Sequence, residues 1–292
     1  MIFSKQTSAL VVSSCLITIL NLASVAPCAA ADGETKLATP QSPRRVLLLW
    51  QGPDGHKPTT HEFEAGIRLI GNMLQRHTNY QVMLSKADEN WERGPELLQQ
   101  ADTTVLFITQ GSRWIQQTPE RLQLFQEYAQ RGGGLVAIHW AIGAKADEYI
   151  PAFLPLLGAT HGGSDRKYAF LKTEFRPAQI NHPIQNGLRP LQVEDEFYYN
   201  LKQVQSSTPV VPVMESKIEG EWYMTSWAWE RPDGGRSFGF SGLHYHGNWR
   251  EEVYRRLIVQ GILWTLKEEI PRDGVDVSIN EEWLKLPVLA EN

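Results

Sequence analysis

Short runs of apolar residues recur along the first half of the chain, separated by segments whose apolar residues are three or four positions apart. A continuous apolar run fits a β-strand that is buried on both faces of a sheet. We therefore expect four such strands, within residues 45–50, 80–85, 103–109 and 134–140.

The segments between these runs predict helices. Residues 60–77 have apolar side chains at helical spacing, and Thr60 is placed to cap their N-terminus. Two further helices are expected at residues 95–100 and 118–134, and the second has Pro119 at its first helical position.

Strands that alternate with helices form right-handed βαβ units around a parallel sheet. The first half of the chain therefore predicts a three-layer α/β fold, with a mostly parallel sheet and helices on both faces. In particular, we expect residues 46–50, 104–109 and 135–139 to be neighbouring parallel strands.

After residue 160 the pattern becomes richer in β-structure. A glycine-rich turn at residues 231–236 precedes the last candidate strand, and residues 251–269 predict a closing helix. The candidate strands are residues 167–175, 208–215, 222–230 and 236–242. We expect one domain over residues 45–268 and an irregular C-terminal extension over residues 269–292.

The N-terminus has the pattern of a secretory signal peptide over residues 1–31. Lys5 precedes a mostly apolar stretch, and three alanines at residues 29–31 offer a cleavage site. The alternative is a retained membrane anchor, but Ser, Thr and Asn residues interrupt the stretch, which is short for a membrane span. We expect an exported protein, periplasmic or extracellular, with residues 32–44 as a linker and no membrane contact after cleavage.

Cleavage near Ala31 is a testable expectation. The natively expressed protein should begin at or near Asp32, because signal peptidase recognises the small residues that precede it. Intact-mass measurement or N-terminal sequencing checks this. Recovery of a soluble cytoplasmic chain that begins at Met1 would refute it.

The composition of the chain excludes several kinds of catalytic and binding site. Both cysteines, Cys15 and Cys28, lie in the signal segment, so the cleaved chain would have no disulfide, no thiolate nucleophile and no cysteine metal ligand. Cleavage would also leave 27 basic and 33 acidic residues, a net charge of −6, with no basic run to bind nucleic acid. The sequence has no glycine-rich nucleotide loop or Walker motif, so no nucleotide cofactor is expected, and a homo-oligomer stays open.

Seven of the eight histidines fall in predicted loops or at strand ends. Ligands of α/β sheets bind at the carboxyl ends of the strands, so several of these imidazoles should converge at one edge. The alternative for His139 is a buried histidine bonded to a backbone carbonyl. His244 and His246 would share a face if their strand continued, but two histidines in a glycine loop are also common on surfaces. The seven are His56, His61, His139, His161, His182, His244 and His246.

Carboxylates and aromatic side chains complete the candidate site. A strand at residues 193–200 would place Glu196 and Tyr198 on one face, where a carboxylate can exchange protons with imidazoles. The alternative is a solvated acidic turn. Ten tryptophans offer surface for stacking on a sugar, Trp114 and Trp249 among them, although either could equally belong to the core.

Seven stretches, in order and spacing, resemble the ThuA-like (trehalose-utilisation) family within the class I glutamine amidotransferase-like superfamily. They are GPDGHKPTTHEF, GGGLVAIHWA, GATHGG, NHPIQNGL, EDEFYY, GRSFGFSGLHYHGNW and QGILWTL. The resemblance covers residues 45–268 and implies a flavodoxin-like fold. It places His139 where amidotransferases hold a cysteine nucleophile, so the chain is not expected to be a glutaminase. It also implies a role in the breakdown of trehalose and related sugars, including keto-sugar derivatives.

These observations lead to a hypothesis of an exported lyase, hydrolase or isomerase that acts on a sugar or 3-keto-glycoside. A divalent metal is the expected cofactor, and zinc suits neutral imidazoles and a carboxylate. The expected catalytic residues are His139, Glu196, His244 and His246, the metal ligands His56, His61, His244 and His246, and the sugar contacts His56, His61, Trp140, His161, Tyr198 and Trp249.

The alternative is a carbohydrate-binding or scaffold domain without turnover, on a degenerate amidotransferase fold. Convergence of the histidines would favour the enzyme, and mutually distant histidines would favour the binding domain.

Overall fold

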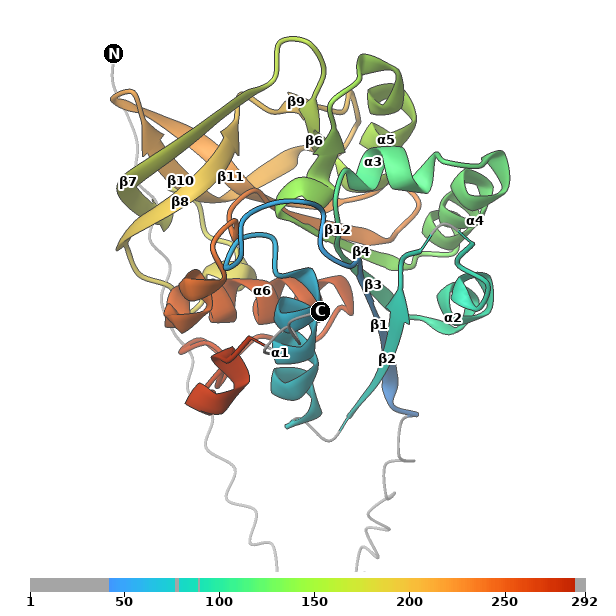
Figure 1. The fold of residues 1–292 in the computed structure, drawn as a ribbon, viewed down its shortest axis with the longest axis horizontal. Coiled ribbons are helices and arrows are strands. Elements are labelled where there is room, and N and C mark those ends of the chain that lie inside the picture. The colour runs from blue at the N-terminus through green and yellow to red at the C-terminus, as the bar shows by residue number, and fades with distance from the viewer. Residues whose placement is uncertain (1–41, 77–78, 89, 287–292) are drawn as a thin grey trace, which may run out of the picture. The chain divides into compact units, whose positions relative to one another are not determined.

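A computed structural model describes residues 42–76, 79–88 and 90–286 of the chain (Figure 1). The predicted signal peptide and the last six residues lie outside this part. Within it, nine strands form one sheet, in the order β2-β1-β3-β4-β12-β11-β10-β7-β8.

The first half of this sheet is parallel, as the apolar runs predicted. β1 lies between β2 and β3, and β4 joins β3 to β12, with all four pairings parallel. The prediction that β1, β3 and β4 are neighbouring parallel strands is confirmed. The strands are β1 (Arg44–Trp50), β2 (Tyr80–Lys86), β3 (Thr103–Phe107), β4 (Gly134–Ile138) and β12 (Arg236–Phe240).

The second half of the sheet is antiparallel, so the expectation of a mostly parallel sheet is wrong. β12, β11, β10, β7 and β8 pair in antiparallel fashion along the sheet. The physical reason is that short turns join β10 to β11 and β11 to β12, and short turns connect antiparallel neighbours. The additional strands are β7 (Lys167–Pro177), β8 (Leu191–Tyr199), β10 (Val210–Ile218) and β11 (Glu221–Glu230).

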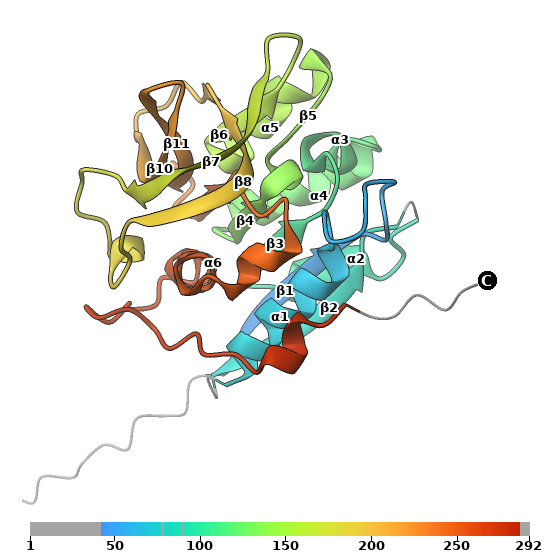
Figure 2. The ribbon, with the colours of Figure 1, turned by 60° about the vertical axis from the view of Figure 1, so that its left-hand side comes forward.

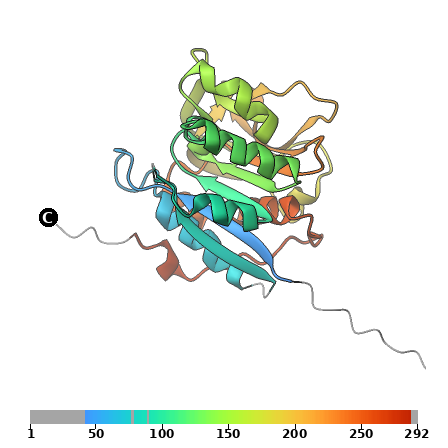
Figure 3. The same ribbon diagram turned by 90° about the vertical axis from the view of Figure 1, so that its right-hand side faces the viewer.

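Helices cover both faces of the parallel strands, which gives three layers there (Figures 1 and 2). Apolar residues of α1 (Phe63–Gln75) and α6 (Glu252–Thr265) pack on Leu48, Val105 and Val136 on one face. Residues of α2 (Gly94–Gln100), α4 (Pro119–Gln130) and α5 (Ile150–Leu157) pack on the other face, and these helices lie in front of the strands in Figure 3.

The helix starts show which capping predictions hold. Thr118 accepts a hydrogen bond from the Arg121 backbone N–H and caps α4, before Pro119. Thr60 does not cap α1, because its hydroxyl donates to the Lys57 carbonyl and the helix begins three residues later.

Shorter elements fill the loops around the strand ends. β5 (Gly143–Ala144), β6 (Ala159–Gly162) and β9 (Lys202–Gln203) form a separate three-stranded sheet. The short helices are α3 (Gly111–Ile115), η1 (His139–Ile142), η2 (Asp147–Tyr149), η3 (Pro183–Gln185), η4 (His246–Arg250) and η5 (Glu281–Leu284).

The segment from residue 270 to 286 is irregular apart from η5. It lies against α6, where Arg255 donates to the Val277 carbonyl and Gln260 accepts from the Val275 backbone N–H. No helix among the described residues is long and apolar enough to cross a membrane.

Candidate functional site

His139 stands at the turn that follows β4. Its backbone adopts a left-handed φ of 54°, which is uncommon for a residue other than glycine and is concentrated at functional sites. β12 lies beside β4, so Ser241, just after β12, is next to His139 and accepts a hydrogen bond from its Nδ1 at 2.9 Å. The other ring nitrogen, Nε2, points into a cluster of polar side chains. The His139 ring is therefore fully buried, with Nδ1 bonded to a backbone carbonyl and Nε2 facing polar side chains.

A short antiparallel bridge joins the segment before α1 to the segment after β12. Thr60 pairs with Tyr245, and the His61 backbone N–H donates to the His244 carbonyl at 3.0 Å. His61 also has a left-handed φ, of 52°. The bridge brings His61 and His244 together, although 183 positions separate them in the sequence.

Asp54 orients the His61 ring through a hydrogen bond to its Nδ1. One carboxylate oxygen, Oδ2, accepts the His61 Nδ1 at 2.7 Å and the Thr109 hydroxyl at 2.6 Å. The other, Oδ1, accepts the His56 Nδ1 at 2.7 Å. Burial acts to raise the pKa of Asp54, but the hydrogen bonds from His61 and Thr109 hold it well below its usual range. The Asp54 carboxylate is therefore ionised, and the Nδ1 atoms of His56 and His61 each carry a proton.

Burial lowers the pKa of His61 to about 4, despite the opposing hydrogen bond to Asp54. The imidazole is therefore neutral near pH 7, with its proton on Nδ1 and a lone pair on Nε2. This is the form in which a histidine binds a metal ion.

Glu196 extends from β8 toward His139 and His244. Its Oε2 lies 3.0 Å from the His244 Nδ1 and 3.4 Å from the His139 Nε2. Burial acts to raise the pKa of Glu196, but its close contacts with the His139 and His244 rings hold that pKa well below its usual range. The group is an ionised carboxylate among imidazoles.

The neighbouring residue, Asp195, fixes the backbone of this corner. Its carboxylate accepts the backbone N–H groups of Leu243, His244 and Glu196 at 2.7, 3.0 and 2.9 Å, and the Tyr254 hydroxyl at 2.9 Å. Asp195 is fully buried, so burial raises its pKa while the donated hydrogen bonds oppose that shift. Asp195 thus holds the strand that carries Glu196 against the loop that carries His244.

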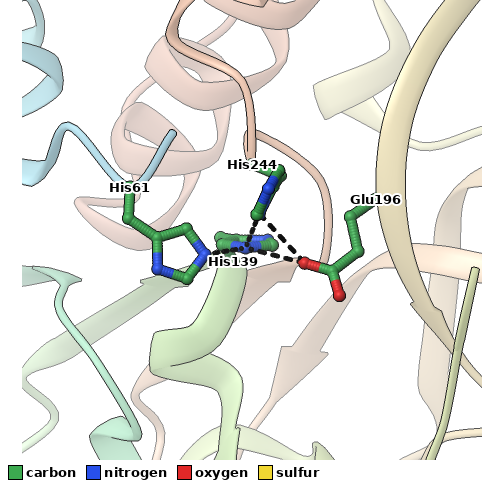
Figure 4. Close-up of side chains that lie close together, drawn as sticks. All are labelled: His61, His139, Glu196 and His244. Carbon is green, nitrogen blue, oxygen red and sulfur yellow. Dashed lines mark hydrogen bonds and ion pairs between the residues drawn. The ribbon is translucent and has the colours of Figure 1, made fainter. Parts of the chain in front are cut away.

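Four side chains converge in the centre of this arrangement (Figure 4). The Nε2 atoms of His61 and His139 are 3.0 Å apart, and the His244 Nδ1 is 3.3 Å from the His139 Nε2. With the Glu196 carboxylate they form a group whose possible ligand atoms all lie within 4.8 Å of one another. Each of the four residues is at most 6% exposed.

Aromatic rings stack beside this cluster. The rings of His161, Tyr198 and His139 lie nearly parallel, with centroids 4.1 and 4.8 Å apart. The Tyr198 hydroxyl is 3.2 Å from the His139 Nε2 and donates to Glu196. Burial, followed by the charge of Glu196, raises the pKa of Tyr198 well above its usual value, so the hydroxyl keeps its proton. Tyr198 and Glu196 therefore share a face of β8, as the alternation predicted.

A pocket of about 250 Å³ opens onto the cluster. His61, Glu196 and Tyr198 form part of its wall, together with His56, Trp140 and His161. Lys145, Arg166, Tyr168 and Phe170 complete the lining. The His56 side chain is 37% exposed, so it can meet a bound molecule directly.

Two predicted site residues lie elsewhere. The strand before His244 ends at Phe240, so His246 does not share its face; it begins η4 and its Nε2 bonds the Leu284 carbonyl. Trp249 is 1% exposed and packs in the core near Phe107, so it cannot stack on a sugar. The group of four therefore contains His139 and Glu196, where the expected metal set had His56 and His246.

Sequence reasoning missed residues whose role depends on tertiary contacts. Asp54 lies in the same stretch, GPDGHKPTTHEF, as His56 and His61. A carboxylate so close to two histidines in the sequence could have been recognised as their hydrogen-bond partner. Tyr168 and Phe170 gave none, because an aromatic residue in a strand is usually buried, yet both are more than half exposed.

Comparison with known proteins agrees with the fold. A ThuA-like protein from Bacteroides uniformis superposes with a TM-score of 0.59 at 13% identity, over 78% of this chain and 94% of that one. A cytoplasmic protein from Salmonella typhimurium gives a TM-score of 0.56 at 15% identity, over 76% and 99%. No curated protein matches the sequence.

The family model described as trehalose utilisation, ThuA, matches residues 45–265. This span runs from β1 to the end of α6 and includes all four residues of the buried cluster. The match covers most of the chain, and so the protein belongs to the ThuA family.

Proposed function

We propose that His61, His139, Glu196 and His244 hold a divalent metal ion, and that zinc suits them best. The observation that supports this most is the 3.0 Å separation of the His61 and His139 Nε2 atoms. Each ring donates its Nδ1 proton outward, to Asp54 and to Ser241, so two lone pairs face each other. A cation between the nitrogens removes this repulsion. A proton on the His61 Nε2 would do the same, but burial lowers the pKa of His61 to about 4.

The distances fit such an ion. Ligand atoms bonded to tetrahedral zinc at about 2.0–2.2 Å lie about 3.3–3.6 Å from one another. The four closest pairs in the cluster are 3.0, 3.0, 3.3 and 3.4 Å apart. Three imidazoles and one carboxylate match the donor types that zinc prefers, and Asp54 supports His61 as carboxylates do behind metal-bound histidines.

The pocket beside this cluster supports an enzyme that acts on a sugar or 3-keto-glycoside. When bound, the metal ion would polarise an oxygen atom of the sugar. His139 is buried and its Nε2 is engaged in the cluster, so it serves as a ligand in this proposal and not as the base. His56 is the better base, because Asp54 accepts the proton of its Nδ1, which leaves the lone pair on Nε2, and its side chain is 37% exposed and lines the pocket.

The proposed reaction begins with a carbon acid. A 3-keto group makes the neighbouring C2–H acidic, and His56 Nε2 takes that proton. The electron pair forms a C1–C2 double bond conjugated with the ketone, and the C1–O bond breaks. The departing oxygen takes that proton back from His56 and leaves as an alcohol, so no net proton is gained or lost. Convergence of the histidines supports this enzyme over a binding domain without turnover, and the N-terminal pattern supports export.

A turnover assay tests this proposal. Zinc-loaded protein is mixed with a 3-keto-glucoside, and release of the aglycone is followed beside chelator-treated protein. We expect release with zinc, its loss on metal removal, and its return on adding zinc. Binding of the glycoside by zinc-loaded protein without any release would favour the non-catalytic alternative.

His56→Ala is expected to reduce kcat by about 100-fold or more, because general bases contribute this much to proton abstraction. Metal content should stay that of the wild type, since His56 is not among the four proposed ligands. Steady-state kinetics with metal analysis of the same sample check this. An unchanged kcat would remove His56 from the mechanism.

Asp54→Asn is expected to weaken zinc binding by about 10- to 100-fold, as loss of a carboxylate behind a ligand histidine typically does. The amide cannot accept both Nδ1 protons as the carboxylate does. Competition with a zinc chelator measures the change. Asp273→Asn, an exposed position in the C-terminal segment, is the control and should bind zinc like the wild type; equal affinity for both variants would argue against His61 as a ligand.

A further inference from the structure

Two cationic side chains line the pocket that opens onto the buried cluster. Lys145 follows β5, and Arg166 precedes β7. Among the described residues that line this pocket, Glu196 is the one carboxylate, and it belongs to the proposed metal site. The wall that a ligand would meet is therefore positively charged.

Neither charge is neutralised in the described part of the chain. Arg166 donates from Nη1 to the Gly163 carbonyl, and the Lys145 ammonium lies 5.2 Å from the centroid of the Trp140 ring. No carboxylate there lies within 4.0 Å of either cation, whereas nearby Lys202 pairs with Asp165. Unpaired cations in a chain with a net charge of −5 mark a place where an anion can bind.

The charge of Arg166 reaches into the pocket. Burial is the main cause that lowers the pKa of His161 to about 3, and the positive charge of Arg166 is the next. His161 lines the same pocket and stacks on Tyr198. A ligand beside His161 would therefore experience the field of Arg166.

Aromatic side chains on the same pocket fit the apolar face of a sugar ring. Tyr168 and Phe170 are 51% and 54% exposed, and both extend from one face of β7 because they are two residues apart. Their ring centroids are 6.1 Å apart, and Trp140 lines the pocket with them. The exposed aromatic rings can pack on the apolar face of a sugar ring, and the unpaired cations beside them can bind a negative charge on the same ligand.

We propose that the sugar bound in this pocket carries an anionic group, a carboxylate or a phosphate, which Arg166 and Lys145 bind. This inference rests on the proposed function, because it names the class of sugar that the same site accepts. A guanidinium presents a planar pair of donors that matches either anion, and the ammonium adds a second positive charge. The rings of Tyr168 and Phe170 then contact the sugar.

Titration calorimetry of the zinc-loaded mature protein tests the proposal with three probes: glucose, glucuronate and glucose 6-phosphate. We expect at least one anionic sugar to bind about tenfold or more tightly than glucose, as one charged hydrogen bond typically gives. Tighter binding of glucuronate would identify a carboxylate, and tighter binding of glucose 6-phosphate would identify a phosphate. Equal affinities for all three probes would overturn the proposal while leaving the metal site and sugar binding standing.

Variants separate the pocket cations from the metal, which can itself attract an anion. In Arg166→Ala and Lys145→Ala the preference for the anionic sugar should fall about tenfold, with unchanged zinc content. Arg189→Ala and Lys267→Ala, at exposed positions outside this pocket, are the controls and should keep the preference. A preference that survives in both pocket variants would assign anion binding to the metal and contradict the inference. Zinc-loaded protein that binds none of the probes would contradict both this inference and the proposed function.

Discussion

Replacing His139 with alanine is expected to lower zinc affinity by at least about 100-fold and to abolish turnover, while the protein stays folded. His139 Nε2 is the atom nearest to the other three proposed ligands, at 3.0 Å from His61, 3.3 Å from His244 and 3.4 Å from Glu196. Its removal also relieves the contact between two lone pairs in the metal-free protein. Chelator competition measures the affinity, and a thermal melt of the metal-free protein measures the stability.

His182→Ala is the matched control. His182 is also largely buried, but its Nδ1 accepts the Ile184 backbone N–H at the start of η3. Loss of such a cap typically costs about 1 kcal/mol, so this variant should melt earlier and bind zinc normally. If His139→Ala instead melted earlier and kept both its zinc and its activity per folded molecule, His139 would be a structural residue.

Asp195→Ala is expected to destabilise the protein by about 4 kcal/mol and to lower Tm by about 10 °C. The carboxylate accepts four hydrogen bonds, and its removal leaves three backbone N–H groups and the Tyr254 hydroxyl buried without an acceptor. The variant should also lose zinc, because Glu196 and the loop of His244 are no longer held together.

Glu194→Ala is the control for this experiment. Glu194 is exposed on the same strand, one residue away, and its side chain has none of these contacts. Calorimetric melts of both variants should therefore differ by most of the expected 10 °C or so. Equal melting temperatures would show that the Asp195 contacts do not stabilise this corner of the molecule.

The parallel half of the fold follows from local sequence pattern. Buried strands appear in the sequence as unbroken apolar runs, and the helices between them have apolar residues three or four positions apart. This alternation made it possible to predict that β1, β3 and β4 are neighbours. The antiparallel half was predictable as strands but not as an arrangement. Pairing such as β7 with β10 joins residues far apart in sequence, and local pattern does not encode it.

Part of the candidate site could likewise be predicted from the sequence, and part depends on the tertiary structure. His61, His139, Glu196 and His244 stood out as residue types near strand ends, which a sheet aligns along one edge. Which histidines meet depends on backbone details, such as the left-handed conformations at His61 and His139 and the bridge of Thr60 to Tyr245. His246 is separated from His244 because η4 begins at His246, whose Nε2 bonds the distant Leu284 carbonyl.

The proposed mechanism depends on one metal ion among His61, His139, Glu196 and His244. Anomalous X-ray diffraction at the zinc edge, from crystals of the zinc-loaded protein, would locate that ion. We expect one strong anomalous peak bonded to His61 Nε2, His139 Nε2, Glu196 Oε2 and His244 Nδ1. No peak at this position, or a peak bonded instead to Asp54 and His56, would contradict it.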